Sequence, residues 1–226
     1  MADGITIHQF HTVKTLHDAV AALIRKHLKT RSASPHALML SGGHTPLHVY
    51  QAIAQRPSAI ADSAYLTYTD DRHVPVDSPD SNYGNTLPMI QALGLPEERV
   101  IRIHPELALE DAAQRFHEDF VHFFADGGRI HAGLLGLGPD GHTCSLFTRE
   151  GLDRGSGRYA IPTYREPGPN RVSVTPDLLE RIERVIFLVA GEDKMPIIEQ
   201  LRTDPASVIA GQAVAGCPFV ELWYAV

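Results

Sequence analysis

The segment HAGLLGLGPDGHTCSLF, residues 131–147, joins an apolar run to a glycine-rich turn and then to a histidine. The run His131–Gly138 has the length of a strand, so we expect a strand that is buried within a sheet. Residues 136–141 also match GxGxxG, but the match falls past the middle of the chain, Pro139 stiffens the turn, and no first strand–helix–strand unit surrounds it. The segment therefore predicts a strand that ends in polar groups, and no dinucleotide site.

Short apolar runs alternate with amphipathic helices on both sides of this segment. Leu16, Val20, Ile24 and Leu28, for example, recur at the spacing of one helix face. The pattern predicts strands at residues 5–10, 36–41, 64–69, 100–104, 131–138, 171–175, 185–190 and 219–226. It predicts helices at residues 12–28, 46–55, 83–93, 108–124 and 194–202, a short helix from residue 176, a long polar loop from residue 70 and another loop at 149–158.

This alternation favours the α/β class, with a mainly parallel sheet that helices cover on both faces. The chain has no internal repeat, low-complexity tract or clear linker, so we expect one domain over residues 1–226. Ligands of such sheets bind at the carboxyl ends of the strands. Four predicted strands end in polar segments, namely SGGHT (41–45), DDR (70–72), GPDGH (138–142) and GEDK (191–194). We therefore expect these segments to form one site.

The composition restricts the partners. Lysine and arginine number 20 and aspartate and glutamate 27, which gives a net charge of −7 with histidine neutral. Nucleic-acid-binding proteins usually carry a basic stripe, and because the sequence has none we expect no nucleic-acid partner. No signal peptide and no apolar run of about 18 residues is found, so we expect no membrane association and a cytoplasmic location. We expect a monomer or a weak homodimer.

Disulfide and metal sites have little support in the sequence. Cys144 and Cys217 form no CxxC pair. The close histidine pairs at positions 8 and 11 and at 117 and 122 lack the i, i+4 spacing of metal ligands on one helix face, and no HExxH occurs. We therefore expect no metal ion and no other cofactor.

The SGGHT segment is a candidate phosphate loop between a strand and a helix. Its residues are Ser41, Gly42, Gly43, His44 and Thr45. Glycines let backbone N–H groups face a ligand, and a helix start favours an anion. The Lys-Ser/Thr ending of a Walker A loop is missing, so a nucleoside triphosphate is not implied. An ordinary tight turn is the alternative interpretation.

Charged side chains follow the other strand ends. Asp70, Asp71 and Arg72 can orient a polar substrate and bind a phosphate, although an isolated charged triplet is more often a surface ion-pair cluster. Lys194 and Arg171 could each place a positive charge on a phosphate, and the alternative for both is an ordinary surface cation. An acidic chain needs such a local cluster of cations to bind an anionic substrate.

His142 is the candidate general base, because it follows Gly141 at a strand end and an imidazole exchanges protons near neutral pH. A loop or capping histidine is the alternative, since the chain has 13 histidines. Cys144 and Ser145 lie close by in sequence. No G-x-S-x-G motif surrounds Ser145, so covalent catalysis is not favoured.

In this order, the segments resemble the 6-phosphogluconolactonase family. The resemblance rests on LSGGHTP (40–46), DDRHVP (70–75) with SPDSNYGNT (78–86), LGLGPDGHTCSLF (135–147), NRVSVTPDLL (170–179) and GEDK (191–194). It implies a Rossmann-like, doubly wound fold, shared with glucosamine-6-phosphate deaminases. It also implies hydrolysis of 6-phosphoglucono-1,5-lactone in the pentose phosphate pathway without a metal or cofactor.

The chemistry of the residues agrees with this reaction, since a lactone is an activated ester that needs a base and a site for the oxyanion. His142 would activate water, and Asp70 or, as the second choice, Asp140 would orient its imidazole. Backbone N–H groups around Gly138, Asp140 and Gly141 would stabilise the oxyanion. The 6-phosphate would be held by the loop at 41–45 and by three cations, namely Arg72, Lys194 and Arg171.

The sequence departs from the family pattern at His44, where Ser is common, at Asp71, where Glu is usual, and at Cys144, where Ala is usual. Two other functions remain open. A glucosamine-6-phosphate deaminase would continue DGH with an acidic residue close by, whereas here the next is Glu150. A non-catalytic sugar-phosphate sensor would carry a DNA-binding extension, and the sequence has none.

Overall fold

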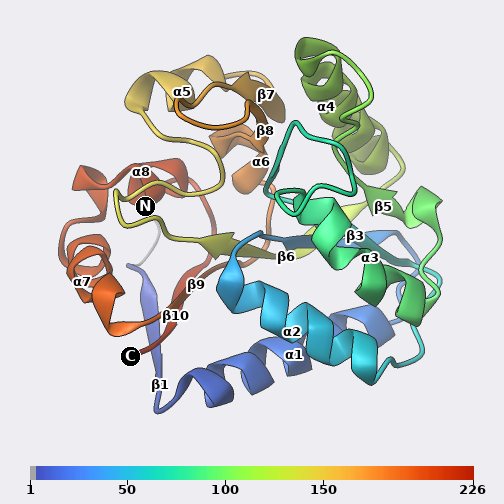
Figure 1. Cartoon of the computed structure of the whole chain (residues 1–226), viewed down its shortest axis with the longest axis horizontal. Coiled ribbons are helices and arrows are strands. Elements are labelled where there is room, and N and C mark those ends of the chain that lie inside the picture. Colours follow the sequence, from blue (N-terminus) through green and yellow to red (C-terminus); the bar gives the residue numbers. More distant parts are fainter. Residues whose placement is uncertain (1–3) are drawn as a thin grey trace.

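The computed structural model describes residues 4–226 and is built on a seven-stranded sheet (Figure 1). Residues 1–3, at the start of the segment assessed for a signal peptide, lie outside the described residues. Every pairing in this sheet is parallel, which confirms the prediction of a mainly parallel sheet. In spatial order the strands are β1 (Thr6–Phe10), β10 (Val220–Ala225), β9 (Val185–Ala190), β6 (Arg129–Gly136), β2 (His36–Leu40), β3 (Ala64–Tyr68) and β5 (Val100–Ile101).

Helices cover both faces of the sheet, so the doubly wound prediction is also confirmed (Figure 1). Strand β2 shows this directly, because Ala37 and Met39 belong to one apolar core and Leu38 and Leu40 to the other. One core contains side chains of α1 (Val13–Lys29), α2 (His44–Gln55) and α3 (Asn82–Leu93). The other contains side chains of α4 (Leu109–Ala125), α6 (Pro176–Leu179), α7 (Met195–Thr203) and α8 (Ile209–Ala213).

Helix α1 forms where the hydrophobic spacing predicts it. Thr12 caps its first turn, accepting a hydrogen bond from the backbone N–H of Thr15 at 3.1 Å, which satisfies a donor that the helix itself leaves free. Leu16, Val20 and Ile24 are fully buried against the sheet. None of the helices in the described part of the chain is long and apolar enough to cross a lipid bilayer.

The structure differs from the predictions in the segments that follow the main strands. A second, antiparallel sheet contains β4 (Asp70–Arg72), β8 (Arg171–Val174) and β7 (Ala160–Thr163), so residues 171–175 do not join the main sheet. The predicted loop at 149–158 contains a short helix, α5 (Arg149–Arg154), which Thr148 caps. The strand predicted at 100–104 is only two residues long. These elements are too short for hydrophobic periodicity to identify them.

The order of the strands creates a crevice between β2 and β6. From β2 the chain passes through α2 to β3 on one side, whereas from β6 it leads on to β9 on the other side. Such a switch in direction separates the two connecting segments at the carboxyl edge of the sheet. The SGGHT segment after β2 and the GPDGH turn after β6 therefore lie on either side of one opening.

Candidate active site

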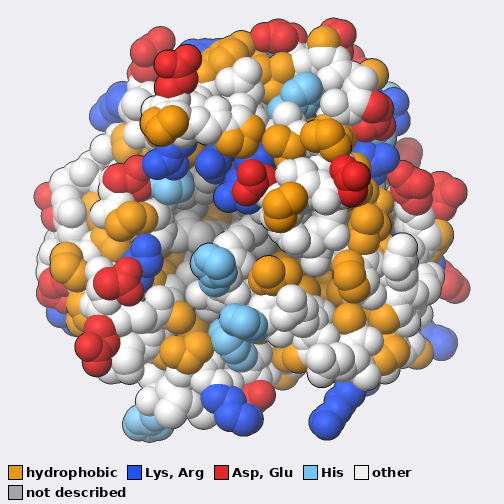
Figure 2. Space-filling model, in the orientation of Figure 1, with side chains coloured by type: hydrophobic (Ala, Val, Ile, Leu, Met, Phe, Trp, Pro, Cys, Tyr) orange, Lys and Arg blue, Asp and Glu red, His pale blue; other side chains and the backbone are white. Residues whose placement is uncertain are grey.

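Two adjoining cavities occupy this crevice at the carboxyl edge. One, of about 180 Å³, is lined by Ser41, Gly42, Gly43, Thr69, Asp70, Arg72, Asn82, Gly136, Leu137, Gly138, His142, Cys144 and Arg171. The second, of about 200 Å³, shares its SGG segment, Arg72 and Asn82 with the first, and His44 also lines it. Figure 2 shows a hollow near the middle of this face, with lysine and arginine side chains gathered along one rim and histidines close to it.

His142 lines the cavity with an oriented imidazole. Its Nδ1 is hydrogen-bonded to a carboxylate oxygen of Asp140, and its ring packs on Phe147 with the centroids 4.7 Å apart. The carboxylate accepts a hydrogen bond from Nδ1–H, so in the neutral imidazole Nε2 keeps its lone pair. Burial pushes the pKa of Asp140 upward, but the hydrogen bond and charge of His142 outweigh it, and the net pKa is lowered. Asp140 is therefore ionised and able to stabilise the protonated imidazole.

Gly138 leaves the space that the imidazole fills. A Cβ atom at this position would lie 2.1 Å from His142 Nδ1 and 2.6 Å from Asp140 Oδ1. The turn is closed by hydrogen bonds from Gly138 N–H to the carbonyl of His142 at 2.8 Å and from Gly141 N–H to the carbonyl of Gly138 at 2.9 Å. The N–H groups of Gly138 and Gly141 are therefore occupied within the turn and do not face a ligand in this geometry, whereas the expectation that the N–H of Asp140 stabilises the oxyanion stays a prediction.

Asp70 lies in the cavity wall but does not contact His142, so the first of the two expectations for the imidazole's partner is wrong. Its carboxylate accepts hydrogen bonds from Ser145 Oγ at 2.6 Å and from Thr69 Oγ1 at 2.7 Å. No hydrogen bond joins Asp70 to His142 among the described residues. The physical reason is distance along the chain: Asp140 is two residues from His142 in the same turn, whereas Asp70 is held in β4 by the small sheet.

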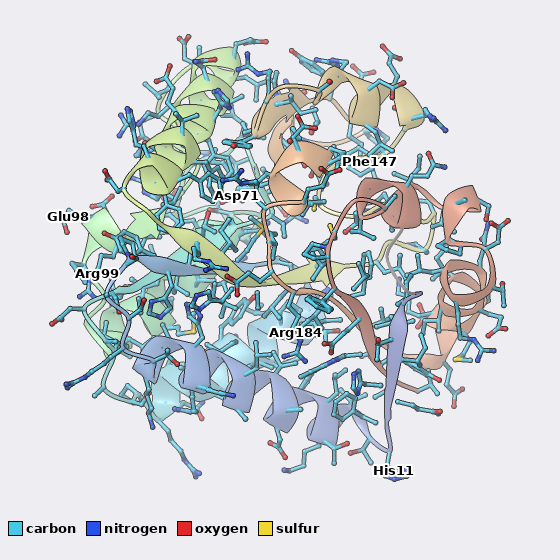
Figure 3. All side chains as sticks on the ribbon, turned by 180° about the vertical axis from the view of Figure 1, so that it is seen from behind. His11, Asp71, Glu98, Arg99, Phe147 and Arg184 are labelled. Atoms are coloured by element: carbon cyan, nitrogen blue, oxygen red, sulfur yellow. The ribbon has the colours of Figure 1, made fainter. Side chains whose placement is uncertain are left out.

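Asp71 has a structural role at the start of α3 (Figure 3). Its carboxylate accepts hydrogen bonds from the backbone N–H groups of Asn82 at 2.6 Å, Tyr83 at 3.0 Å and Arg72 at 2.8 Å. Burial raises its pKa to about 6, in spite of these hydrogen bonds. Asp71 therefore anchors the helix that carries Asn82. The family usually has glutamate at this position, and the aspartate found here still provides a carboxylate for this structural role.

Arg72 is held at the rim of both cavities. Its Nη1 donates to the backbone carbonyl of Asp80 at 2.8 Å and to Asn82 Oδ1 at 3.2 Å, and Asn82 in turn donates to the carbonyl of Asp70 at 2.8 Å. Gly42 is required here, because a Cβ atom on it would lie 2.0 Å from Asn82 Oδ1. Asn82 was not predicted as a site residue, and its only signal in the sequence is its place in SPDSNYGNT.

Arg171 lies beside the buried Asp70. Its Nη1 donates to Ser145 Oγ at 3.4 Å. Burial lowers the pKa of Arg171 and the negative charge of Asp70 opposes this, but a guanidinium stays protonated at neutral pH. The Nε atoms of Arg171 and Arg72 and the hydroxyl of Ser41 are buried without a hydrogen-bond partner. Unpaired polar groups of this kind are typical of a site that binds a polar ligand.

Arg165 is a second residue that the sequence did not indicate. Its guanidinium lies 4.5 Å from the ring centre of Phe147, and its Nη2 is 3.8 Å from the second carboxylate oxygen of Asp140. Arg171 approaches the same ring, at 5.5 Å. Phe147 is thus contacted by two cations and by the imidazole of His142.

Two predicted phosphate-binding residues are not brought to the cavities. Lys194 follows β9 in a short 3-10 helix, its ammonium lies 3.9 Å from Asp193, and it lines neither cavity. Thr45 lies one residue inside α2 and also lines neither. By contrast, the N–H groups of Gly42 and Gly43 make no hydrogen bond within the described residues, so they are available to a ligand.

Cys144 is a buried residue of the cavity wall, and Ser145 is buried beside it. Burial, together with the nearby charge of Asp70, raises the pKa of the Cys144 thiol well above its usual value, which leaves it protonated and a poor nucleophile. The Ser145 hydroxyl donates to Asp70 and receives a hydrogen bond from Arg171. Neither side chain hydrogen-bonds His142 among the described residues, so the expectation against covalent catalysis agrees with the geometry.

Comparison with known proteins places this geometry in a family. Residues 9–216 match the family model described as glucosamine-6-phosphate isomerases/6-phosphogluconolactonase. The chain is 32% identical to a 6-phosphogluconolactonase of Haemophilus influenzae over 176 residues, covering 76% of this chain and 75% of the relative. It is 32% identical to the human 6-phosphogluconolactonase over 204 residues, covering 82% and 78%. The crystal structure of devB protein superposes with a TM-score of 0.85 at 27% identity, covering 98% and 96%.

The chain therefore belongs to the glucosamine-6-phosphate isomerase/6-phosphogluconolactonase family. This confirms the resemblance that the five sequence segments indicated.

Proposed function

We propose that this chain hydrolyses 6-phosphoglucono-1,5-lactone to 6-phosphogluconate. The observation that carries the proposal is the pairing of His142 with Asp140 at a cavity that also contains two arginines and the SGG segment. The names of the relatives support it, since both curated relatives described above are 6-phosphogluconolactonases.

In the proposed reaction, Nε2 of His142 takes a proton from water as the oxygen of that water attacks the lactone carbonyl. A tetrahedral oxyanion forms, and collapse then breaks the bond between the carbonyl carbon and the ring oxygen. The imidazolium returns its proton to the departing ring oxygen, which leaves as a hydroxyl group, so the imidazole is regenerated. Asp140 stabilises the imidazolium in between and holds the ring by Nδ1.

The phosphate of the substrate would bind to Arg72 and Arg171, with the free N–H groups of Gly42 and Gly43 as further donors. Arginine can offer two parallel hydrogen bonds to a phosphate, and helix α2 begins directly after Gly43, where its dipole favours an anion. A chain of net charge −7 needs a local cluster of positive groups to bind an anionic substrate, and these groups provide one. Binding a remote phosphate also positions the carbonyl against the base.

The test is hydrolysis of freshly prepared 6-phosphogluconolactone, corrected for spontaneous opening. A positioned general base contributes about 10²–10⁴ in rate, so His142→Ala and His142→Gln should lower kcat/KM on that scale while the protein stays folded. The matched control is His122→Ala, an exposed histidine on α4.

Three results would contradict the proposal. The first is turnover by folded His142→Ala at the wild-type rate. The second is equal kcat/KM for gluconolactone with and without the phosphate. The third is release of ammonia from glucosamine 6-phosphate by a chain that leaves the lactone untouched.

A further inference from the structure

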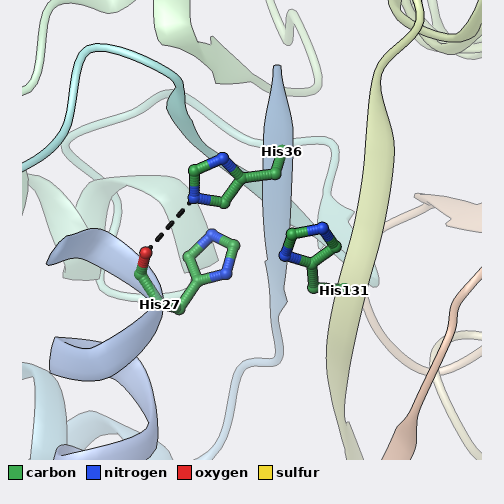
Figure 4. Close-up of side chains that lie close together, drawn as sticks. All are labelled: His27, His36 and His131. Carbon is green, nitrogen blue, oxygen red and sulfur yellow. Dashed lines mark hydrogen bonds between the residues drawn. The ribbon is translucent and has the colours of Figure 1, made fainter. Parts of the chain in front are cut away.

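Three histidines from separate elements meet at the amino-terminal edge of the main sheet (Figure 4). His27 lies near the end of α1, His36 is the first residue of β2, and His131 is the third residue of β6. One ring nitrogen from each lies within 4.8 Å of the others. The cluster is remote from the proposed active site, because the five residues of β2 separate His36 from Ser41 by about 17 Å at about 3.3 Å each.

The three rings form a compact group inside the protein. His36 stacks on His131 with the centroids 5.0 Å apart, and His27 meets His36 edge-on at 4.7 Å. His36 is fully buried, His27 is 8% exposed, and His131 is half-buried. The group therefore has one side open to solvent, at His131.

Two nitrogen atoms of this cluster have no partner among the described residues. They are His27 Nε2 and His36 Nδ1, both of which are buried. The other ring nitrogen of His36, Nε2, lies 3.3 Å from the backbone carbonyl of His27, which is a long contact (Figure 4). An unpaired polar atom in the protein interior destabilises the fold, so apolar side chains would pack here more favourably than three imidazoles unless the nitrogens bind a ligand.

Two of the imidazoles have a lowered pKa. Burial, together with the neighbouring His36 and His131, lowers the pKa of His27 to about 3. Burial also lowers the pKa of His131, although the charge of Glu183 opposes this. Burial therefore favours the neutral form of His27 and His131, and a neutral imidazole offers a nitrogen lone pair to a metal.

We propose that His27, His36 and His131 bind one Zn²⁺ ion, with a water molecule as the fourth ligand on the open side of His131. Three imidazoles are a zinc ligand set, and they favour zinc and similar late first-row ions over Mg²⁺ or Ca²⁺, which prefer oxygen. Tetrahedral Zn–N bonds of about 2.0–2.1 Å bring the nitrogens to about 3.4 Å from one another. Rotation of the side chains must then draw the ring nitrogens together by up to about 1.4 Å. This movement breaks the 3.3 Å contact between His36 Nε2 and the carbonyl of His27.

The ion would link α1 and β2, which follow one another in the sequence, to β6, which comes much later in the chain and pairs with β2 in the sheet. Such a link stabilises the folded chain, since the site exists only when the three elements are packed. It adds no group to the lactone site at the opposite edge of the sheet. Zinc should therefore raise the melting temperature and leave kcat/KM unchanged.

The experiment uses untagged full-length protein that has been treated with a chelator and then titrated with Zn²⁺ by calorimetry. Co²⁺ serves as a second probe, because its visible absorption reports tetrahedral nitrogen ligands. The variants are His131→Ala, at the partly open position, and His27→Gln. The controls are His122→Ala, for an exposed histidine, and His142→Ala, for metal that binds at the lactone site instead.

We expect one Zn²⁺ per chain in the wild type, a higher melting temperature with zinc, and a loss of affinity on the order of 100-fold in both cluster variants. Both controls should bind as the wild type does. The proposal is overturned if the wild type does not bind zinc stoichiometrically or if folded His131→Ala and His27→Gln retain full affinity. Loss of binding in His142→Ala alone would also overturn it, because the ion would then lie in the lactone site.

Discussion

Replacing Gly138 by alanine should disable the proposed base without disturbing the fold. The backbone at Gly138 does not have the positive φ that would exclude a side chain, so alanine is permitted there. Its methyl group would lie 2.1 Å from His142 Nδ1, whereas ordinary contact between heavy atoms needs about 3.5 Å. The imidazole must therefore move by about 1.4 Å, or the turn must open.

A misplacement of about 1 Å in a catalytic group can cost about 10²-fold in rate. We therefore expect Gly138→Ala to lower kcat for 6-phosphogluconolactone by about 100-fold or more, with a smaller change in KM, because Arg72 and the SGG segment do not depend on this turn. The control is Gly151→Ala in α5, where the nearest atom to a new Cβ would be 3.6 Å away. Wild-type kcat in folded Gly138→Ala, or an equal loss in Gly151→Ala, would refute the reasoning.

Three other changes test separate parts of the structure. Arg72→Ala should lower kcat/KM for the phosphorylated lactone by about 10–100-fold, because a charge-assisted hydrogen bond is lost. Lys194→Ala, outside the cavities, should leave kcat/KM unchanged. Equal effects of the two substitutions would contradict the assignment of Arg72 to the phosphate site. The Cys144 thiol, whose pKa burial raises, should resist iodoacetamide at pH 8 in the native protein and react in urea, as mass spectrometry will show. Glu221→Gln should lower the free energy of unfolding at pH 7 by about 1.5–3 kcal/mol, because Glu221 accepts two hydrogen bonds, at 2.5 and 2.8 Å, from Arg184, which is labelled in Figure 3. Burial tends to raise the pKa of Glu221, but the Arg184 hydrogen bonds outweigh this and lower the pKa below 4.5. The stabilisation is therefore present above pH 4.5 and is lost as the pH falls below that value. A difference in unfolding free energy between wild type and Glu221→Gln that persisted in acid would contradict this explanation.

The main sheet could be predicted from the sequence because its strands are buried on both faces. In β2, for example, residues 37–40 are all apolar and turn residues flank the strand, which is a strong signal. The small sheet could not be predicted, since Asp70–Arg72 is three charged residues long and pairs with Arg171–Val174 a hundred residues later. Pairing at that separation depends on tertiary structure, which no local pattern reports.

The candidate site was predicted where a motif is local and mispredicted where it depends on packing. The turn at residues 138–142 contains both His142 and its partner Asp140, and the sequence already offered Asp140 as one of two alternatives. Asp70, the other alternative, comes after a different strand. Its side chain faces Ser145 instead, a contact between residues 75 positions apart.

The three-histidine cluster has no signal in the sequence for a similar reason. Metal ligands on one helix face are one turn apart, whereas His27, His36 and His131 come from one helix and two strands. Only the parallel alignment of β2 and β6 brings them together, with His36 opposite Arg129 in the register. Ligand sets of this kind become visible only when the strand order is known.

The position of β1 has a consequence for the order in which the protein can fold during synthesis. Among the strands that the structure describes, β1 pairs with β10 alone, and β10 is translated after all the others. Until then, both the backbone edge of β1 and the matching edge of β9 are unpaired, and α1 is attached to a strand with no neighbour. Unpaired edges of this kind promote association with other chains. We therefore expect the nascent chain to need protection by chaperones until residues 220–225 have been translated, and C-terminal truncation before β10 to give insoluble protein.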